Sequence, residues 1–124
     1  MIVLKTNREL ALMREACIIS AGALKLAGEA VEPGVTTAEI DKIAYDYIIK
    51  CGAKPNFLNY NGYPATACIS INDEVIHGIP SKKRVIEEGD IVSIDLGAVL
   101  EGFNGDNAAT FAAGAISSEA KRLC

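Results

Sequence analysis

Hydrophobic residues recur with helical spacing in the first third of the chain. Thr6 and Glu9 have the spacing of a capping box, in which each side chain bonds the backbone N–H of the other residue, so a helix is predicted to begin there. The apolar spacing that follows is typical of an amphipathic helix, which Pro33-Gly34 would end. This spacing places on its inner face Leu10, Met13, Cys17, Ala21, Leu24 and Val31.

A second helix is predicted after Pro33-Gly34. Thr36 and Glu39 repeat the capping pattern, and Cys51-Gly52 would end the helix because glycine tolerates a left-handed C-terminal turn. The inner face of this helix is expected to contain Ile40, Ile43, Tyr47 and Ile48.

The pattern then changes to short runs that are typical of strands. A loop rich in Asn, Gly and Tyr is expected over 55–64, and turns are expected at 88–90 and 101–102. The predicted strands are 67–71, 75–77, 91–99 and 103–112. We therefore predict one α+β domain over residues 1–124, with two amphipathic helices on a mostly antiparallel sheet.

The last residues resemble a helix start at Ser117-Ser118-Glu119, and the chain stops soon after it. A chain that stops inside a helix is expected to be a cut fragment, and a frayed native terminus is the alternative.

Composition and charge exclude several classes of protein. Half of the 124 residues are hydrophobic, which excludes a disordered chain, and 12 basic against 16 acidic residues leave a net charge of −4. We therefore expect no nucleic acid and no membrane as partner, and we interpret the basic run 82–84 as a solvated turn. No signal peptide or membrane span is recognisable. The four cysteines form no CxxC pair, so we expect a cytoplasmic protein with reduced thiols, three of them packed as small apolar residues.

Asp95 and Asp106 are the strongest candidates for chemistry. Asp95 lies within an apolar strand, where a carboxylate is depleted, and Asp106 lies in the strand that follows. A turn centred between Leu100 and Glu101 would place the two aspartates directly opposite each other. A turn centred one residue later would make them diagonal neighbours, and in either register both side chains point to one face unless the hairpin contains a bulge.

Two carboxylates on one face repel each other unless one is protonated or a cation lies between them. Divalent metals bridged by carboxylates are one solution. The alternative is that Asp106 is a turn residue and Asp95 a half-exposed strand residue without function.

The single histidine, His77, is a second candidate, although a lone histidine is usually structural. The glycine after it would let another chain approach closely. Aromatic residues and a cysteine around the loop before it could either wall an apolar pocket or fill the core. They are Phe57, Tyr60, Tyr63 and Cys68.

Several motifs, in order and at matching spacing, resemble type I methionine aminopeptidase. They are Asn59-Tyr60-Asn61-Gly62-Tyr63-Pro64, Cys68-Ile69-Ser70-Ile71-Asn72, His77-Gly78-Ile79-Pro80, Gly89-Asp90-Ile91-Val92-Ser93-Ile94-Asp95 and Gly102-Phe103-Asn104-Gly105-Asp106. The resemblance covers the whole chain. It implies half of a pita-bread fold, which consists of two similar α+β halves with a dinuclear metal site between them.

The resemblance also implies an activity, the removal of the initiator methionine from new polypeptides. Asp95 and Asp106 match two metal ligands, with Asp106 bridging, and His77 matches a catalytic histidine near the scissile amide. The methionine pocket would contain Phe57, Tyr60, Tyr63, Cys68 and His77. Asn72 matches the place where a monovalent cation is held, and the metals would be Mn, Fe or Co, two in the complete enzyme.

The chain departs from the family pattern because the other ligands, one His and two Glu, and the catalytic glutamate are missing. We therefore expect a truncated chain that is inactive alone and whose substrates in the complete enzyme are N-terminal Met peptides or nascent chains. The alternatives are a peptide- or protein-binding module and a self-associating fragment. A homodimer would cover a predicted apolar face around Asp95, Asp106, His77 and Tyr63.

Overall fold

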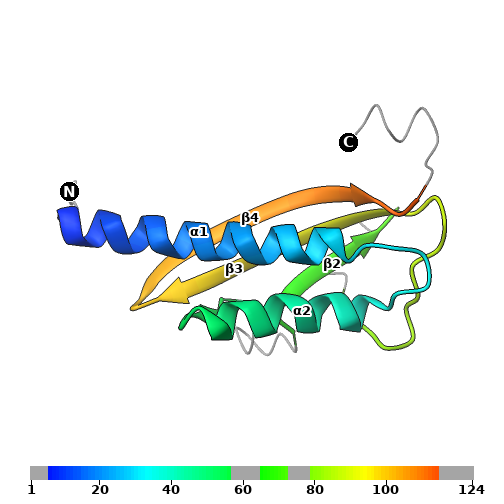
Figure 1. The fold of residues 1–124 in the computed structure, drawn as a ribbon, viewed down its shortest axis with the longest axis horizontal. Coiled ribbons are helices and arrows are strands. Elements are labelled where there is room, and N and C mark those ends of the chain that lie inside the picture. The colour runs from blue at the N-terminus through cyan, green and yellow to red at the C-terminus, as the bar shows by residue number, and fades with distance from the viewer. Residues whose placement is uncertain (1–5, 57–64, 73–78, 115–124) are drawn as a thin grey trace.

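The computed structural model describes residues 6–56, 65–72 and 79–114. Here two helices, α1 (Asn7–Glu29) and α2 (Thr37–Lys50), pack on a four-stranded antiparallel sheet. Figure 1 shows the helices side by side in one layer and the sheet in the other. The predicted α+β architecture is confirmed. The segments 75–77 and 117–119, predicted as a strand and as a helix start, lie outside the described residues.

The helices begin where the sequence predicts. Thr6 caps α1 and forms a complete capping box with Glu9, and the Thr36 side chain accepts from the Glu39 backbone N–H at the start of α2. Cys51 caps the end of α2, and Gly52 follows with a φ of +81°. Helix α1 ends at Glu29, several residues before Pro33, so the prediction that it extends to Pro33 is wrong.

The predicted inner face of α1 is also wrong at three of its six positions, whereas Leu24 and Val31 are buried as predicted. Leu10, Cys17 and Ala21 are exposed, whereas the buried side chains lie on a neighbouring stripe of the helix. The buried residues are Ala16, Ile19, Ser20, Ala23, Leu24 and Ala27. Small apolar residues occupy most of the circumference of α1, so their spacing alone does not select the stripe that meets the sheet.

The sheet is built around one long central strand. Strand β3 (Ile91–Leu100) pairs on one edge with β1 (Lys54–Pro55) and β2 (Ala67–Ile71), and on the other edge with β4 (Phe103–Ala112). Strand β1 falls at the start of the region that the sequence predicts as a loop. The other described strands match their predicted bounds to within one residue.

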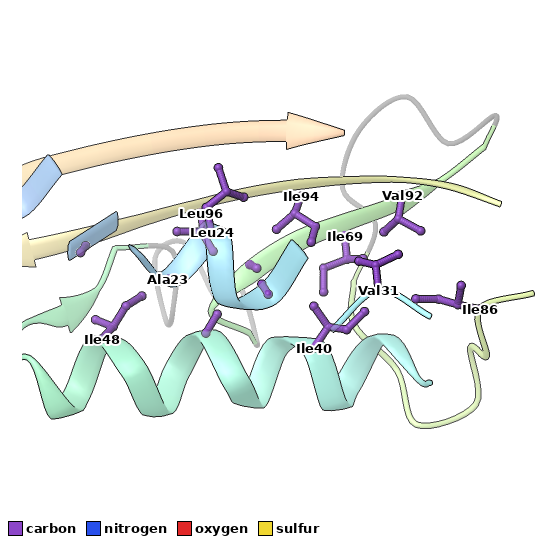
Figure 2. Close-up of a cluster of buried hydrophobic side chains, with 14 of the residues drawn as sticks. Ala23, Leu24, Val31, Ile40, Ile48, Ile69, Ile86, Val92, Ile94 and Leu96 are labelled. Atoms are coloured by element: carbon purple, nitrogen blue, oxygen red, sulfur yellow. The ribbon is translucent and has the colours of Figure 1, made fainter. Parts of the chain in front are cut away.

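The core lies between the helix layer and one face of the sheet. Figure 2 shows side chains from α2, β2 and β3 that point into this space, including Ile40, Ile69 and Ile94. Gly105 of β4 allows a close approach to the backbone of α1, because a Cβ there would lie 2.4 Å from the Ala16 backbone. The sheet and α1 therefore meet at a backbone contact.

The cysteines do not contribute to this core as predicted. Cys17 and Cys51 are exposed and Cys68 is half-buried, and all three are free thiols. Because Cys17 and Cys51 are exposed, the prediction that three of the four cysteines pack as small apolar residues is wrong.

Candidate functional site

The candidate aspartates are held by the β3–β4 hairpin. Its turn consists of Glu101 and Gly102, both with positive φ (49° and 85°), which is the geometry of a two-residue type I′ turn. This turn is centred between Glu101 and Gly102, so Asp95 lies opposite Ala108 and Asp106 lies opposite Gly97. The pairing continues without a bulge to Ile91 and Ala112. The two aspartates are thus diagonal neighbours on one face, the second of the two registers that the sequence leaves open.

This face is the one turned away from the helices. Along β3, Val92, Ile94 and Leu96 are buried on the helix side, and the intervening Ser93 and Asp95 are exposed. Asp106 is exposed as well. We call this surface of β2, β3 and β4 the open face.

The two carboxyl groups perturb each other. Partial burial raises the pKa of Asp95 to about 6, and both the negative charge of Asp106 and a hydrogen bond to the Asp106 carboxyl group contribute to the rise. Asp95 would therefore hold its proton at a pH where an isolated aspartate is ionised. A cation between the two groups would relieve the same repulsion.

Small and polar residues surround the pair. Cys68 of β2 lies directly opposite Asp95 on the edge of β3 away from β4, and the Ser93 and Thr110 hydroxyls are 3.0 Å apart. Beside Asp106, Gly97 accepts a hydrogen bond of 2.9 Å from the Asn56 N–H. A Cβ at Gly97 would lie 3.1 Å from the Asn56 Cβ, so a glycine here permits this close approach.

The residues present fit part of a metal site. Carboxylate oxygens are suitable ligands for divalent ions such as Mn. A cation bound between Asp95 and Asp106 would also neutralise the repulsion between their carboxylates. Within the described ranges, no group of three or more His, Cys, Asp or Glu side chains could hold a metal ion. Asp95 and Asp106 could therefore supply at most two ligands to a metal ion.

The remaining predicted site residues divide into two groups. Phe57, Tyr60, Tyr63 and His77 lie outside the described residues. Asn72 is described, has a φ of +53°, and uses its side chain to join the end of β2 to the start of β3. Its Nδ2 donates to Asp90 Oδ1 and its Oδ1 accepts from the Ile91 N–H, each at 2.9 Å. The monovalent cation at Asn72 stays a prediction.

The basic turn 82–84 is exposed, as predicted, and lies beside two cavities of about 300 and 320 Å³. Their linings include Ile69, Ile79 and Ser81 in one, and Asn72, Val85 and Asp90 in the other. Asp95 and Asp106 line neither of these two cavities.

Asp41 is a residue of this region that the sequence analysis did not single out. Its Oδ1 accepts from the backbone N–H groups of Thr66 (3.0 Å) and Ala67 (2.8 Å), which ties α2 to the start of β2. Burial raises the pKa of Asp41 despite these bonds. An aspartate next to the buried Ile40 on an amphipathic helix was the available signal.

Comparison with known proteins decides the family of this chain. The model of metallopeptidase family M24 matches residues 11–124. The chain belongs to metallopeptidase family M24.

Its similarity to individual relatives extends over nearly the whole chain. It is 53% identical to a methionine aminopeptidase of Clostridium acetobutylicum, over 99% of this chain and 49% of that protein. It is 47% identical to methionine aminopeptidase 1 of Bacillus subtilis, with the same two shares. The chain thus spans about half the length of these curated relatives.

Solved structures show the same relationship. The methionine aminopeptidase of Thermotoga maritima superposes with a TM-score of 0.95 at 39% identity, over 99% of this chain and 49% of that one. The prolidase of Pyrococcus furiosus gives a TM-score of 0.81 at 27% identity, over 98% and 34%. The predicted fold class, half of a pita-bread fold, is confirmed. None of the helices in the described residues could cross a membrane.

Proposed function

We propose that Asp95 and Asp106 are two ligands of the divalent metal site of a methionine aminopeptidase, and that this chain supplies about half of that site. The observation that carries the proposal is the pair itself. Two neighbouring carboxyl groups share the open face, and the partial burial of Asp95 together with the charge of Asp106 raises the pKa of Asp95 to about 6. Membership of a metallopeptidase family supports a metal as the group that relieves this repulsion.

The chemistry would be hydrolysis of the peptide bond after an N-terminal methionine. When bound, Mn, Fe or Co would polarise the scissile carbonyl and lower the pKa of water. The Asp95 and Asp106 carboxylates would hold the metals. Cys68, which lies opposite Asp95, would contact the methionine side chain together with Phe57, Tyr60 and Tyr63, and His77 would hydrogen-bond the amide.

The substrates would be N-terminal Met peptides or nascent chains in the cytoplasm. We further propose that the 124 residues are inactive alone, because two carboxylates do not complete the coordination of two metals. The chain also has no acidic residue after Glu119 to act as the missing general base. Activity would require the remaining ligands from a second polypeptide segment.

An assay of Met-Ala-Ser hydrolysis with Mn or Co tests this function. The chain would be measured alone and mixed with the half of the Clostridium acetobutylicum enzyme that it does not match. We expect no turnover by the chain alone and chelator-sensitive turnover by the mixture. In the mixture, Asp106→Asn should reduce turnover at least about 100-fold, and Asp46→Asn, an exposed aspartate on α2, should leave it unchanged.

Two results would contradict the proposal. Chelator-sensitive turnover by the pure chain would show that it needs no second segment. Equal turnover by Asp106→Asn in an active mixture would remove Asp106 from the metal site. Tight binding of the peptide without turnover in the mixture would instead support the alternative of a peptide-binding module.

A further inference from the structure

Two neighbouring cavities lie beside β2, the strand on the edge of β3 away from β4. The first, of about 300 Å³, is lined by Ile69, and the second, of about 320 Å³, by Ile71, two residues further along the strand. Lys83 and Arg84 line both of them. The two cavities therefore adjoin and form one groove, which we call the β2 groove, with two cationic side chains where they meet.

The backbone that carries these cations is fixed to the start of α2. The Ser81 N–H donates to the Thr37 hydroxyl (2.8 Å), and the Thr37 N–H donates to the Arg84 carbonyl (3.0 Å). Between them, the Lys83 N–H donates to the Ser81 hydroxyl (3.0 Å). Figure 1 shows this segment at the end of the molecule where α2 begins. The basic turn is thus exposed but held in place, so a ligand would order less of the backbone on binding.

Positive charge is concentrated in the first cavity. No carboxylate is among the described residues that line it, and Lys83 forms no ion pair with another described residue. The lining of the second cavity includes Glu87 and Asp90. The Asp90 carboxylate already accepts from Asn72 Nδ2 and from the Glu87 N–H, each at 2.9 Å. An anionic group would therefore bind in the first cavity.

Apolar side chains also border the β2 groove. Ile79 lines the first cavity and is 55% exposed, and Val85 lines the second and is 46% exposed. The groove thus offers apolar contact beside two positive charges. None of its described lining residues is aromatic, so nucleic acid bases would find no side chain to stack on, and the net charge of −4 disfavours a polyanion.

We propose that the β2 groove binds a short peptide segment of a partner protein, one that combines acidic and apolar side chains. A carboxylate of this segment would bind Arg84 and Lys83, because a guanidinium presents paired N–H groups to both carboxylate oxygens. A neighbouring apolar side chain would contact Ile79 or Val85. Each cavity has a volume at the lower end of the range of ligand pockets, so we expect weak binding, with a Kd of about 0.1–1 mM.

This binding site is independent of the proposed peptidase reaction. Asp95 and Asp106 line neither of the two cavities, and the open face that carries them is a different surface of the sheet. A failure of peptide binding would therefore leave the proposed metal site unaffected, and the reverse also holds.

Fluorescence anisotropy with a labelled peptide, acetyl-Leu-Glu-Asp-Val-Glu-Leu, would measure binding to the 124-residue chain. The control peptide, acetyl-Leu-Gln-Asn-Val-Gln-Leu, has the same size and apolar residues without the charges, and we expect it to bind at least about tenfold more weakly. A single-stranded RNA of about 12 nucleotides should also bind more weakly than the acidic peptide. Added salt should weaken binding of the acidic peptide, because the cations are exposed.

Paired variants locate the site. Lys83→Gln combined with Arg84→Gln should raise the Kd of the acidic peptide at least about tenfold. Lys50→Gln combined with Lys82→Gln removes the same charge from exposed positions that line neither cavity, and it should change Kd less than about twofold. Ile79→Ser should raise Kd about threefold or more, because the apolar contact is lost.

NMR spectra of the wild type give a second measurement that needs no variant. The acidic peptide should shift the amide signals of Ser81 and Lys83 and leave those of Ser93 and Thr110, on the open face, unchanged. The anisotropy titration repeated with the missing half of the Clostridium acetobutylicum enzyme present should give the same Kd.

Several results would overturn the proposal. Equal binding of the acidic and the control peptide, or tighter binding of the RNA, would remove the acidic peptide as the ligand. Unchanged binding by the chain with Lys83→Gln and Arg84→Gln, or amide shifts confined to the open face, would place the peptide elsewhere. Loss of binding in the presence of the missing half would show that this half, and no partner protein, covers the groove.

Discussion

The two faces of strand β3 have opposite characters. On the helix side, Val92, Ile94 and Leu96 are at most 1% exposed and belong to the hydrophobic cluster that also contains residues of both helices and β2. On the open face, Ser93 and Asp95 alternate with them and remain exposed. Within the described residues, the side chains on the helix face of β3 are covered by other parts of the fold. The open face instead brings together two carboxyl groups that repel each other. This difference indicates that the first face holds the fold together and that the second is available for binding.

The largest expected effect comes from truncating the helix face. Ile94→Ala should lower the free energy of unfolding by about 2–5 kcal/mol, because it removes buried methyl groups and leaves a cavity. Chemical denaturation measures this loss. Ser93→Ala, one residue away on the open face, should change stability by less than about 0.5 kcal/mol. Equal losses in both variants would contradict the division between the faces.

A smaller loss is expected where the helix layer meets β4. Gly105→Ala would place a Cβ 2.4 Å from the Ala16 backbone, and a helix backbone cannot move as easily as a side chain. We expect a loss of about 1–3 kcal/mol in the same denaturation experiment. The control is Asn104→Ala, which changes the exposed residue directly before Gly105. It should leave the free energy of unfolding nearly unchanged. A neutral Gly105→Ala would show that α1 does not contact β4 this closely.

The smallest effect, and the only gain, is expected at the open face. Because the folded chain holds the Asp95 proton with a pKa of about 6, above that of an unfolded aspartate, stability should fall as the pH rises from about 4 to 6 and then level off. Asp95→Asn should remove this fall. At pH 7.5 we expect a gain below about 1 kcal/mol, since exposure to solvent screens the repulsion.

The pH dependence of thermal unfolding measures this effect. The difference between wild type and Asp95→Asn should vanish near pH 4, and added Mn should reverse its sign at pH 7.5. A wild-type stability that rises between pH 4 and 6 relative to Asp95→Asn would contradict the account.

The sequence predicts the elements well because local signals define them. Thr6 and Thr36 start the two helices by accepting N–H groups that would otherwise be unpaired, and alternating residues mark β3. The sequence allowed two hairpin registers that differ by one residue, because Glu101 is not a residue that favours the positive φ of the observed turn. Only the observed turn, with Glu101 at φ +49°, decides that Asp95 and Asp106 are diagonal.

Properties that depend on distant contacts were not predictable in this way. The buried stripe of α1 is selected by the approach of Gly105 to Ala16, and no local pattern encodes that contact. The same holds for Asp41, because the N–H groups that it accepts, those of Thr66 and Ala67, lie 25 and 26 residues further along the chain. The aspartate pair itself was predictable because one short hairpin brings both residues together.

Calorimetric titration of the chain with Mn at pH 7.5 would show directly whether Asp95 and Asp106 form part of a metal site. We expect weak binding by the wild type, loss of the binding heat in Asp106→Asn, and unchanged binding in Asp46→Asn, whose aspartate pairs with Lys42 on the surface of α2. Binding by Asp106→Asn equal to that of the wild type would contradict this expectation.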